Sequence, residues 1–368
     1  MEIKFIDLNL QYQTIRSEID NAIQKVIKDS SFVGGDEVIN FEKNFARLIG
    51  TEYSISCGNG TDALYIAMKA LNLKKNEEVL TTSHSWIATS EAISQTGASP
   101  VFVDTEKDSF CINPNLIEEK ITKNTVGIVP VHLYGHPCEM NKISEIAKKH
   151  GLWIIEDCAQ SHLAEFEGSK VGTFGNLSTF SFYPGKNLGA MGDAGCINTN
   201  SEALQKWCEL FARHGGKNNH IFEGINSRMD GIQAAILNTK IIYLNNWTNT
   251  RIQKANYYRE HLKDIEELRL PEIYKNCKHV YHLYTIKTKY RDKLKEFLSY
   301  KGIQTKINYP SILPLLPAYS YLKKTSLDFP ISYQNQKEIL SLPLYPEISK
   351  DSQDYIIENI RSFFKNYK

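Results

Sequence analysis

The sequence carries almost no excess of charge of either sign. Its 368 residues include 43 lysines and arginines against 42 aspartates and glutamates, which gives a formal net charge of +1 at pH 7. Proteins that bind nucleic acids or acidic membranes draw much of their affinity from a surplus of basic side chains. We therefore expect neither a nucleic acid nor a membrane surface among the partners of this protein.

Long apolar stretches and paired cysteines are also missing. No segment approaches the roughly eighteen consecutive apolar residues that a membrane helix needs, and the N-terminal sequence MEIK lacks the apolar core of a signal peptide. The seven cysteines are an odd number without paired or zinc-type spacing, which favours a reducing compartment over a disulfide framework. We therefore expect a soluble, cytoplasmic protein.

Histidines are present but not in the spacing of metal ligands. The ten histidines include His84, His132 and His214, and His162 just after Gln160. Metal sites usually combine histidines and carboxylates at helical or hairpin spacing, which these residues do not show. We expect no metal site, and we interpret His162 either as a residue that positions a ligand or as a hydrogen-bonded histidine of the interior.

What the sequence does contain is a regular alternation of apolar runs and helix-like segments. Hydrophobic residues make up 42% of the chain, enough for a large core. Up to about residue 190, short apolar runs alternate with segments of helical periodicity; the runs lie at 79–80, 101–103, 126–131 and 153–155. This alternation predicts an α/β fold with a mostly parallel sheet covered by helices on both faces.

The second part of the chain reads differently. From Met229 to Lys254 apolar residues fall on one face at helical spacing, which predicts one long helix. A strand at 282–286 and helices at 291–301 and 351–367 suit an α+β unit. We therefore predict a large α/β domain over residues 1–245 and a smaller α+β domain over 246–368, with the N-terminal segment packing on the smaller one.

Lys186 closes the run SFYPGK at 181–186 and is followed by a glycine-rich stretch up to Gly195. A lysine among small residues at a strand end can approach a flat aldehyde cofactor, and burial keeps part of its amine neutral, so that it can form an imine. Pyridoxal phosphate is the candidate cofactor. Taken alone, a lysine after a turn is more often a surface residue, so the interpretation depends on other residues.

Asp157 ends the apolar run LWII at 152–155 and its continuation Glu156. The run predicts a buried strand, and open α/β sheets bind ligands at the carboxyl ends of their strands. An ionised aspartate there can keep the pyridine nitrogen of such a cofactor protonated. Taken alone, Asp157 could equally cap the next helix.

The segment CGNGTD at 57–62 precedes a helix whose apolar face carries Leu64, Ala67, Met68 and Leu71. The first turn of a helix presents free backbone amides and the positive end of the helix dipole, which suit a phosphate. A glycine pair before a helix is by itself a weak signal. Ser181, shortly before Lys186, could add a hydroxyl to the same phosphate site.

These and further motifs resemble the DegT-type sugar aminotransferases, pyridoxal phosphate enzymes of fold type I that place an amino group on a ketone of a nucleotide-linked sugar. The resemblance extends over almost the whole chain. The matching motifs are FIDL at 5–8, FVGG at 32–35, GNGTDAL at 58–64, WIAT at 86–89, HLYG at 132–135, ED at 156–157, SFYPGK at 181–186, GINSRM at 224–229 and QAA at 233–235.

The resemblance implies a role for each site residue. Lys186 would form the imine and Asp157 would contact the pyridine nitrogen, while Gln160 would lie by the ring hydroxyl. Trp86 falls where the family stacks an aromatic side chain on the cofactor ring; without the resemblance it would be read as a core tryptophan. The phosphate would be held by Gly60, Thr61, Ser181 and, from the neighbouring subunit, Asn226. The resemblance therefore implies a homodimer with a shared active site.

The resemblance also implies the substrates. L-glutamate is the usual amino donor of the family, and the motif FYPGKNLG at 182–189 is closest to members that aminate C3 of a dTDP-linked 3-keto-6-deoxyhexose for an amino sugar of a surface polysaccharide, such as lipopolysaccharide O-antigen, or of a glycoside. Amination at C4 and UDP-linked sugars are the alternatives. Many relatives carry histidines where this chain has Asn308-Tyr309-Pro310 and Pro314. The pyrophosphate would then be held differently, with three candidate charge partners: Arg228, Lys217 and Lys306.

Two other functions are compatible with the scaffold. The family's dehydratase members carry histidine at the imine position, whereas this chain has Lys186, which favours transfer over elimination. A regulatory protein that keeps the fold without chemistry would tolerate loss of Lys186 or Asp157, and both are present.

Overall fold

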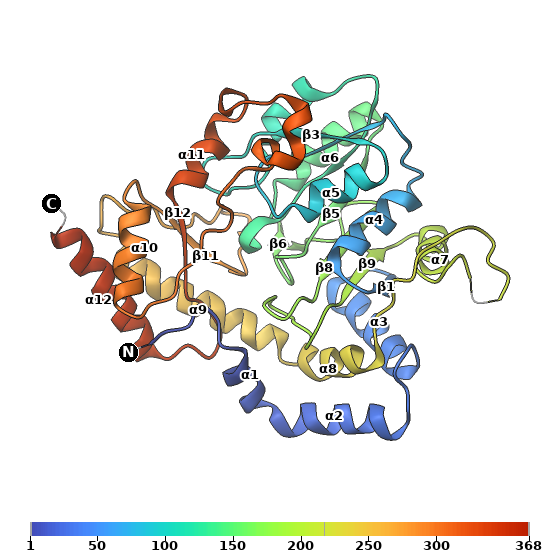
Figure 1. Ribbon diagram of the computed structural model, residues 1–368, viewed down its shortest axis with the longest axis horizontal. Helices are drawn as coiled ribbons and strands as arrows, with labels where there is room; N and C mark the ends of the chain where they lie inside the picture. The colour runs from blue at the N-terminus through green and yellow to red at the C-terminus, as the bar shows by residue number, and fades with distance from the viewer. Residues whose placement is uncertain (1, 217, 367–368) are drawn as a thin grey trace.

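The structure is a computed structural model that describes residues 2–216 and 218–366. At its centre is a seven-stranded sheet in the order β1-β9-β8-β5-β4-β2-β3 (Figure 1). Neighbouring strands from β8 to β3 are parallel, whereas β9 runs antiparallel to both β8 and β1. The strands are β1 (Tyr53–Cys57), β2 (Glu78–Thr82), β3 (Ser99–Val103), β4 (Thr125–Val129), β5 (Trp153–Asp157), β8 (Leu177–Ser181) and β9 (Gly195–Thr199). The predicted mostly parallel sheet is confirmed.

Helices cover both faces of this sheet. Side chains alternate between the faces of a strand, so that Ile154 packs in the cluster that includes α6 whereas its neighbour Ile155 packs in the cluster that includes α4. One face contacts α3 (Asp36–Ile49), α6 (Met140–His150) and α8 (Gly231–Ile241); the other contacts α4 (Gly60–Ala70), α5 (Ala88–Gln95) and α7 (Glu202–Phe211). The strands are buried on both sides, which explains their nearly continuous apolar runs.

The chain on either side of this core adds two extensions. The N-terminal helices α1 (Leu8–Thr14) and α2 (Arg16–Lys28) precede α3, and α2 packs against α8 along one end of the molecule (Figure 1). A small sheet of β10 (Cys277–Lys278), β6 (Glu165–Phe166) and β7 (Ser169–Lys170) joins residues from both halves of the chain.

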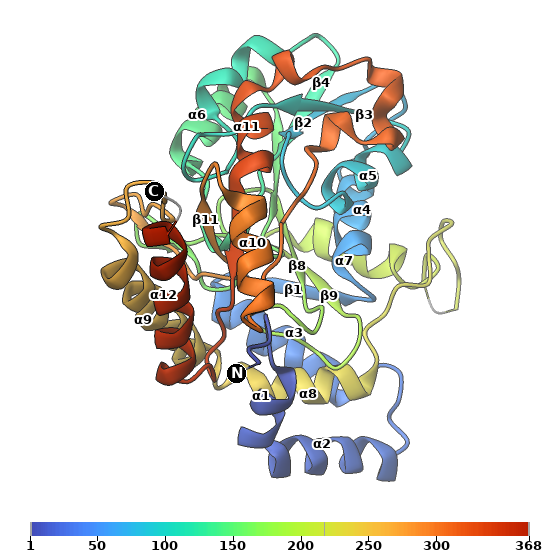
Figure 2. The same ribbon diagram turned by 60° about the vertical axis from the view of Figure 1, so that its left-hand side comes forward.

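A second core lies between α9 (Leu244–Leu262), α10 (Arg291–Tyr300), α12 (Lys350–Asn366) and the two-stranded sheet of β11 (Tyr284–Lys287) and β12 (Ile339–Leu342). The N-terminal segment joins it, because the amide of Ile3 donates to Gly302 and the carbonyl of Ile3 accepts from Gln304. In Figure 2 the N-terminus accordingly lies beside this group of helices. The strand and helices predicted at 282–286, 291–301 and 351–367 are present within one or two residues over the described chain.

Residues 312–338 return to the large sheet. They form η4 (Leu313–Leu315), η5 (Pro317–Leu322), η6 (Ser326–Asp328) and α11 (Pro330–Glu338). Their apolar side chains cluster with Phe102 of β3, and Asp104 accepts hydrogen bonds from the amides of Ile331 and Ser332. In Figure 2 α11 and these turns lie over the β3 end of the sheet. Contacts thus cross residue 245 in both directions, and the division into residues 1–245 and 246–368 stays a prediction.

The prediction of one helix from Met229 to Lys254 is wrong in one respect. The structure has two helices, α8 and α9, which meet at Ile242 and Tyr243. There the amide of Tyr243 donates to the carbonyl of Lys240 three residues back, which tightens the turn and ends α8. No proline or glycine marks this position, so the apolar spacing alone could not reveal it. Over the described residues no helix has the length and apolarity required to span a membrane.

Candidate active site

One cavity of about 910 Å³ opens at the carboxyl ends of β2, β5 and β8. Seven of the eight residues predicted for the site line it, and they are Gly60, Thr61, Trp86, Asp157, Gln160, Ser181 and Lys186. They meet because β5 and β8 are parallel neighbours, so that the strand ends carrying Asp157 and Ser181 lie side by side. The eighth residue, Asn226, lies outside this cavity with an exposed side chain.

Asp157, the last residue of β5, is 4% exposed. Thr89 Oγ1 donates to its Oδ2 at 2.8 Å, and the amide of Ala159 donates to its Oδ1 at 3.1 Å. Burial raises the pKa of this carboxyl group, and the two hydrogen bonds and the charge of Lys186 oppose that shift. A carboxylate has about four acceptor sites, so Asp157 can accept a further donor from within the cavity.

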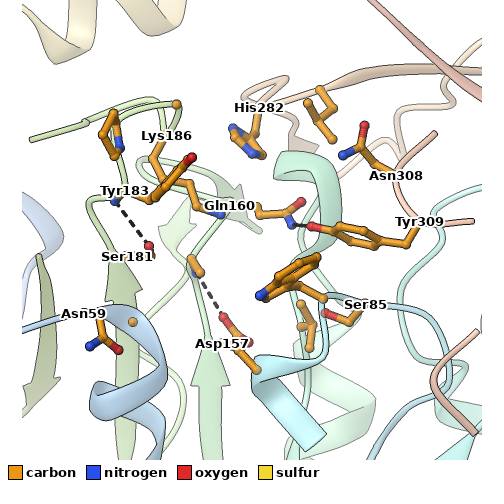
Figure 3. A pocket seen from close by; sticks show the side chains of 18 of the residues that line it. Asn59, Ser85, Asp157, Gln160, Ser181, Tyr183, Lys186, His282, Asn308 and Tyr309 are labelled. Atoms are coloured by element: carbon orange, nitrogen blue, oxygen red, sulfur yellow. Dashed lines mark hydrogen bonds between the residues drawn. The ribbon is translucent and has the colours of Figure 1, made fainter. Parts of the chain in front are cut away.

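Lys186 lies on the loop that follows β8. Its amide donates to the carbonyl of Tyr183 at 2.8 Å, which closes a turn and directs the side chain into the cavity, as Figure 3 shows with Asp157 below it. Burial lowers the pKa of the amine to about 8, and the negative charge of Asp157 opposes that shift. Near neutral pH a larger share of this amine is therefore neutral than in an ordinary lysine, as a nucleophile requires.

The N-terminus of α4 faces the same cavity. Asn59 caps the helix by accepting a hydrogen bond from the amide of Asp62 at 2.8 Å. A Cβ added at Gly60 would lie 2.7 Å from Cβ of Ser181, so only glycine allows the helix to start this close to β8. Among residues 2–216 and 218–366 the amides of Gly60 and Thr61 have no partner. Two free amides beside a hydroxyl at a helix N-terminus form an anion site.

Ser227 holds this anion site in place, and the sequence did not single it out. Its Oγ donates to Oδ2 of Asp62 at 2.6 Å and accepts from the amide of Gly58 at 2.9 Å. The loop carrying Asn226 and Ser227 is thereby fastened to the start of α4. The signal was present, because Ser227 belongs to the motif GINSRM at 224–229.

One wall of the cavity is aromatic. Trp86 is 58% exposed, which rules out the reading as a core tryptophan, and its ring lies 5.5 Å from that of Tyr309. Gln160 is fixed at both ends of its amide, since its Oε1 accepts from the amide of Tyr134 at 2.8 Å and its Nε2 donates to the Tyr309 hydroxyl at 2.9 Å (Figure 3). A flat, partly exposed surface of this kind suits a planar ligand.

The candidate partners of a pyrophosphate are distributed unevenly. Lys306 lines the cavity, with its Nζ 5.1 Å from the centre of the Phe5 ring. Arg228 is exposed and lies outside the cavity. Lys217 lies outside the described residues.

Two of the histidines, His84 and His162, are buried in the interior of the protein. His162 is completely buried among phenylalanine rings, next to the backbone of Ser181, and lies outside the lining of the cavity. Nε2 of His84 accepts the amide of Tyr309 at 3.0 Å. Burial lowers the pKa of His84 to about 4 and that of His162 to about 3, so both rings are neutral near pH 7.

Two further cavity residues come from the second core. Arg251 of α9 and His282, just before β11, line the cavity together with the residues above. No sequence motif marks these two residues, because they lie 65 and 96 residues after Lys186 in a segment predicted to belong to another domain. Only the packing of the two cores brings them to the site.

The sequence matches the DegT/DnrJ/EryC1/StrS aminotransferase family over residues 13–361. The chain belongs to this family. Three similar relatives carry names of different kinds. The dTDP-3-amino-3,6-dideoxy-alpha-D-galactopyranose transaminase of Aneurinibacillus thermoaerophilus is 40% identical, covering 98% of this chain and 99% of the relative. The UDP-N-acetyl-3-dehydro-alpha-D-glucosamine 3-aminotransferase of Acidithiobacillus ferrooxidans is 37% identical, covering 98% of this chain and 97% of the relative. A protein of Geobacillus stearothermophilus named as a pleiotropic regulatory protein is 39% identical over the full length of both.

Solved structures of aminotransferases share the fold. DesV of S. venezuelae, in complex with a ketimine intermediate, superposes with a TM-score of 0.97 at 35% identity, covering 99% of both chains. NtdA of Bacillus subtilis, with the bound cofactor PMP, superposes with a TM-score of 0.91 at 31% identity, covering 99% of this chain and 85% of the other chain. This family member is therefore an aminotransferase of fold type I, and the family and its cofactor-bound structures imply pyridoxal phosphate as its cofactor.

The residues of the cavity fit this cofactor. Four features surround one space. They are a buried carboxylate with a free acceptor site, a lysine with a lowered pKa, an anion site that a Cβ at Gly60 would crowd, and an exposed aromatic wall. These are the groups that a protonated ring nitrogen, an aldehyde, a phosphate and a flat ring require.

Proposed function

We propose that this aminotransferase moves the amino group of L-glutamate to the C3 keto group of a dTDP-linked 3-keto-6-deoxyhexose. The observation that carries the proposal is the arrangement of Lys186 and Asp157 around one cavity, which also holds the anion site at Gly60 and Thr61. The product would serve as an amino sugar for a surface polysaccharide or a glycoside, and the reaction would take place in the cytoplasm.

The cavity residues have distinct tasks toward the cofactor. When bound, pyridoxal phosphate supplies an aldehyde that bonds reversibly to amines and a ring that draws electrons from the carbon next to that amine. Lys186 is the residue to which the cofactor would attach covalently. Asp157 would accept a hydrogen bond from the protonated ring nitrogen at its free acceptor site. Gly60, Thr61 and Ser181 hold the phosphate, Trp86 stacks on the ring, and Gln160 lies by the ring hydroxyl.

Lys186 has a second task once the amino donor has displaced it. Its amine then removes the proton from the α-carbon of the donor, because it is tethered beside that carbon and burial keeps part of it unprotonated. In the second half of the reaction the same amine returns a proton to the sugar carbon that receives the amino group. Removal of the proton needs the lowered pKa, since a fully charged lysine cannot act as a base, and the ammonium form that results is the acid that can return a proton.

The active site is completed by a second copy of the chain. Asn226 is exposed and lies outside the cavity of its own subunit, and its neighbour Ser227 is hydrogen-bonded to the start of α4. We place Asn226 at the phosphate of the neighbouring subunit in a homodimer. Apolar side chains that are exposed in the single chain, such as Val33 and Met191 at 56% and 41%, are available for contacts with such a partner.

The identity of the sugar is supported by the relatives. The Aneurinibacillus thermoaerophilus relative is named as a transaminase that forms a dTDP-linked 3-amino sugar, which favours dTDP and C3. The Acidithiobacillus ferrooxidans relative is named for a UDP-linked sugar that is also aminated at C3, so a UDP-linked keto-sugar is the second candidate. The regulatory name of the Geobacillus stearothermophilus relative does not account for Lys186 and Asp157, which regulation alone would not need.

Absorbance and product analysis test the proposal. The purified protein loaded with pyridoxal phosphate should be yellow and should lose that colour when L-glutamate is added. The glutamate-treated protein should then convert dTDP-linked 3-keto-6-deoxyhexose to the 3-amino sugar, detected by mass spectrometry, faster than UDP-linked 3-keto or dTDP-linked 4-keto substrates. A protein that bleaches with glutamate but aminates none of these sugars would contradict the proposed acceptor, and a protein that never takes up the cofactor would contradict the chemistry.

A further inference from the structure

Arg251 is an unusual lining residue for this cavity because it is almost completely buried. Its side chain is 3% exposed, and it reaches the cavity from α9. Nη1 donates to the carbonyl oxygens of Tyr281 at 3.3 Å and Leu344 at 2.9 Å, while Nε is buried without any partner. The guanidinium group is therefore fixed in position but keeps unused donors.

Within the described residues Arg251 forms no ion pair, although the charge of Glu347 acts on it. Burial lowers its pKa to about 10, so the group remains charged at neutral pH, and the charge of Glu347 opposes the shift. Glu347 does not line the cavity, and no ion pair of Arg251 occurs in the described part of the chain. A buried charge without a partner is costly, and such groups in proteins are normally paired. An anion from the ligand would supply the missing partner.

His282 lies beside this cation on the way to Lys186. Figure 3 shows its ring above the amine of Lys186, and its Nδ1 is buried without a hydrogen-bond partner. Burial, together with the positive charges of Lys186 and Arg251, holds the pKa of His282 well below its usual range. The ring is therefore neutral near pH 7, and a neutral imidazole can donate one N–H.

We propose that Arg251 and His282 form the subsite for the α-carboxylate of the amino donor. This inference rests on the proposed function. The α-carboxylate is bonded to the same carbon as the reacting amine, so it must lie close to Lys186, on the side of the cavity where His282 and Arg251 follow one another. Arg251 supplies the charge and His282 the second hydrogen bond, and a guanidinium group matches a carboxylate in geometry.

A pyrophosphate is the other anion that the substrates offer. It is separated from the reacting carbon by the sugar ring, so it does not have to lie next to Lys186. Lys306 is exposed at the cavity and is the more suitable partner for it. The deep position of Arg251 therefore favours the carboxylate.

The first test measures binding without turnover. α-Methyl-L-glutamate can displace Lys186 but has no α-proton to lose, so the change of the yellow absorbance reports its affinity for the cofactor-loaded protein. Arg251→Gln should weaken this affinity about tenfold to a hundredfold, because a charge-assisted hydrogen bond to a carboxylate is lost. Lys254→Gln removes a neighbouring cation of α9 that lies outside the cavity and should leave the titration unchanged. Equal affinities of wild type and Arg251→Gln would overturn the inference.

The second test identifies the carboxylate and does not depend on how well a variant folds. L-Isoglutamine carries an amide in place of the α-carboxylate, and L-glutamine carries one in place of the γ-carboxylate. For each protein, the affinities for glutamate and for isoglutamine are measured by the loss of yellow absorbance, and their ratio is taken. This ratio should be large in the wild type and should fall several-fold in His282→Gln. That substitution breaks no hydrogen bond of the described structure. The ratio should fall further in Arg251→Gln.

Three outcomes would contradict the subsite. An unchanged glutamate-to-isoglutamine ratio in both variants would show that neither residue contacts the α-carboxylate. A change confined to the glutamate-to-glutamine ratio would assign the residues to the γ-carboxylate. If Arg251→Gln weakened the binding of dTDP and left the glutamate titration unchanged, Arg251 would be assigned to the nucleotide. If instead the wild-type protein fails to bleach with glutamate, the proposed function itself is wrong, so the two failures are distinguishable.

Discussion

Glu156 and Asp157 are neighbouring carboxylates at the end of β5, but their surroundings differ. Glu156 is completely buried and accepts hydrogen bonds from the amides of Gly172, Phe174 and Gly175 at 2.7 to 2.8 Å. His132 adds a fourth contact, at 3.1 Å. The carboxylate of Asp157 accepts from only two donors of the described chain and faces the cavity.

The difference shows what separates a structural carboxylate from one that is available to a ligand. Each acceptor site of Glu156 is used to fasten a loop and a histidine, so it has nothing left to offer. The same saturation argues against a metal at His132, Glu156 and Cys158, although their ligand atoms lie within 4.8 Å of one another. The amide of Cys138 donates to Nδ1 of His132, whose Nε2 must then carry the proton and donate to Glu156.

The largest expected effect is that of Asp157→Asn. The asparagine amide has nearly the shape of the carboxylate. Its oxygen can still accept from the amide of Ala159, and its NH2 group can donate to the Thr89 hydroxyl, so the stability of the fold should change little. Removing one member of a buried charge pair costs about 3–5 kcal/mol, which corresponds to roughly a hundredfold to several-thousandfold in rate. Single-turnover bleaching with glutamate measures the rate, and bleaching at the wild-type rate would remove Asp157 from its proposed role.

Glu156→Gln should have the opposite profile. The NH2 group of the glutamine would face backbone N–H donors that then lack an acceptor. Each buried donor left unpaired lowers the free energy of unfolding by about 1–3 kcal/mol. We expect a lower free energy of unfolding in urea and a lower melting temperature, with bleaching by glutamate retained in the folded fraction. A variant that is fully stable, or one that is folded but inactive, would break the distinction between the two carboxylates.

Gly60→Ala tests the cavity side at its phosphate end. The added methyl group would collide with Cβ of Ser181, so the start of α4 must shift and its free amides move with it. The loss of one hydrogen bond to a charged phosphate is worth about 1.5–3 kcal/mol, or roughly a tenfold to hundredfold weaker affinity for pyridoxal phosphate. Equilibrium dialysis checks this, and an unchanged affinity would move the phosphate away from Gly60.

The pH dependence of cofactor attachment gives the smallest effect. Only the neutral amine of Lys186 reacts with the aldehyde, so the rate of attachment to the cofactor-free protein should rise with pH and level off above a pKa of about 8. An ordinary lysine would keep accelerating up to about 10.4. Asp157→Asn should move the midpoint to lower pH, because the negative charge that supports the ammonium form is gone, whereas Glu156→Gln should leave it in place. Stopped-flow absorbance distinguishes these results.

The sequence predicted the parts of the site that follow from local patterns. Asp157 was found because a buried strand ends there, and Lys186 and Gly60 because glycine-rich segments adjoin a strand and a helix start. Parallel pairing of β5 and β8 then brings them together.

What the sequence could not predict depends on contacts between distant segments. Arg251 and His282 reach the cavity only because the second core packs against the first, and residues 312–338 return to β3 without any signal in their composition. The break between α8 and α9 coincides with a tightened turn, in which the amide of Tyr243 donates to Lys240, and apolar spacing does not encode such a turn.

If Lys186 and Asp157 contact opposite ends of one bound ring, chemical trapping should find the cofactor bonded to Lys186. The cofactor-loaded protein is reduced with borohydride, which makes the bond between the cofactor and its lysine permanent, and is then digested and mapped by mass spectrometry. Our account predicts a single modified site at Lys186, with the same site but a shifted absorbance in Asp157→Asn. Modification of other lysines instead, or none at all, would contradict it.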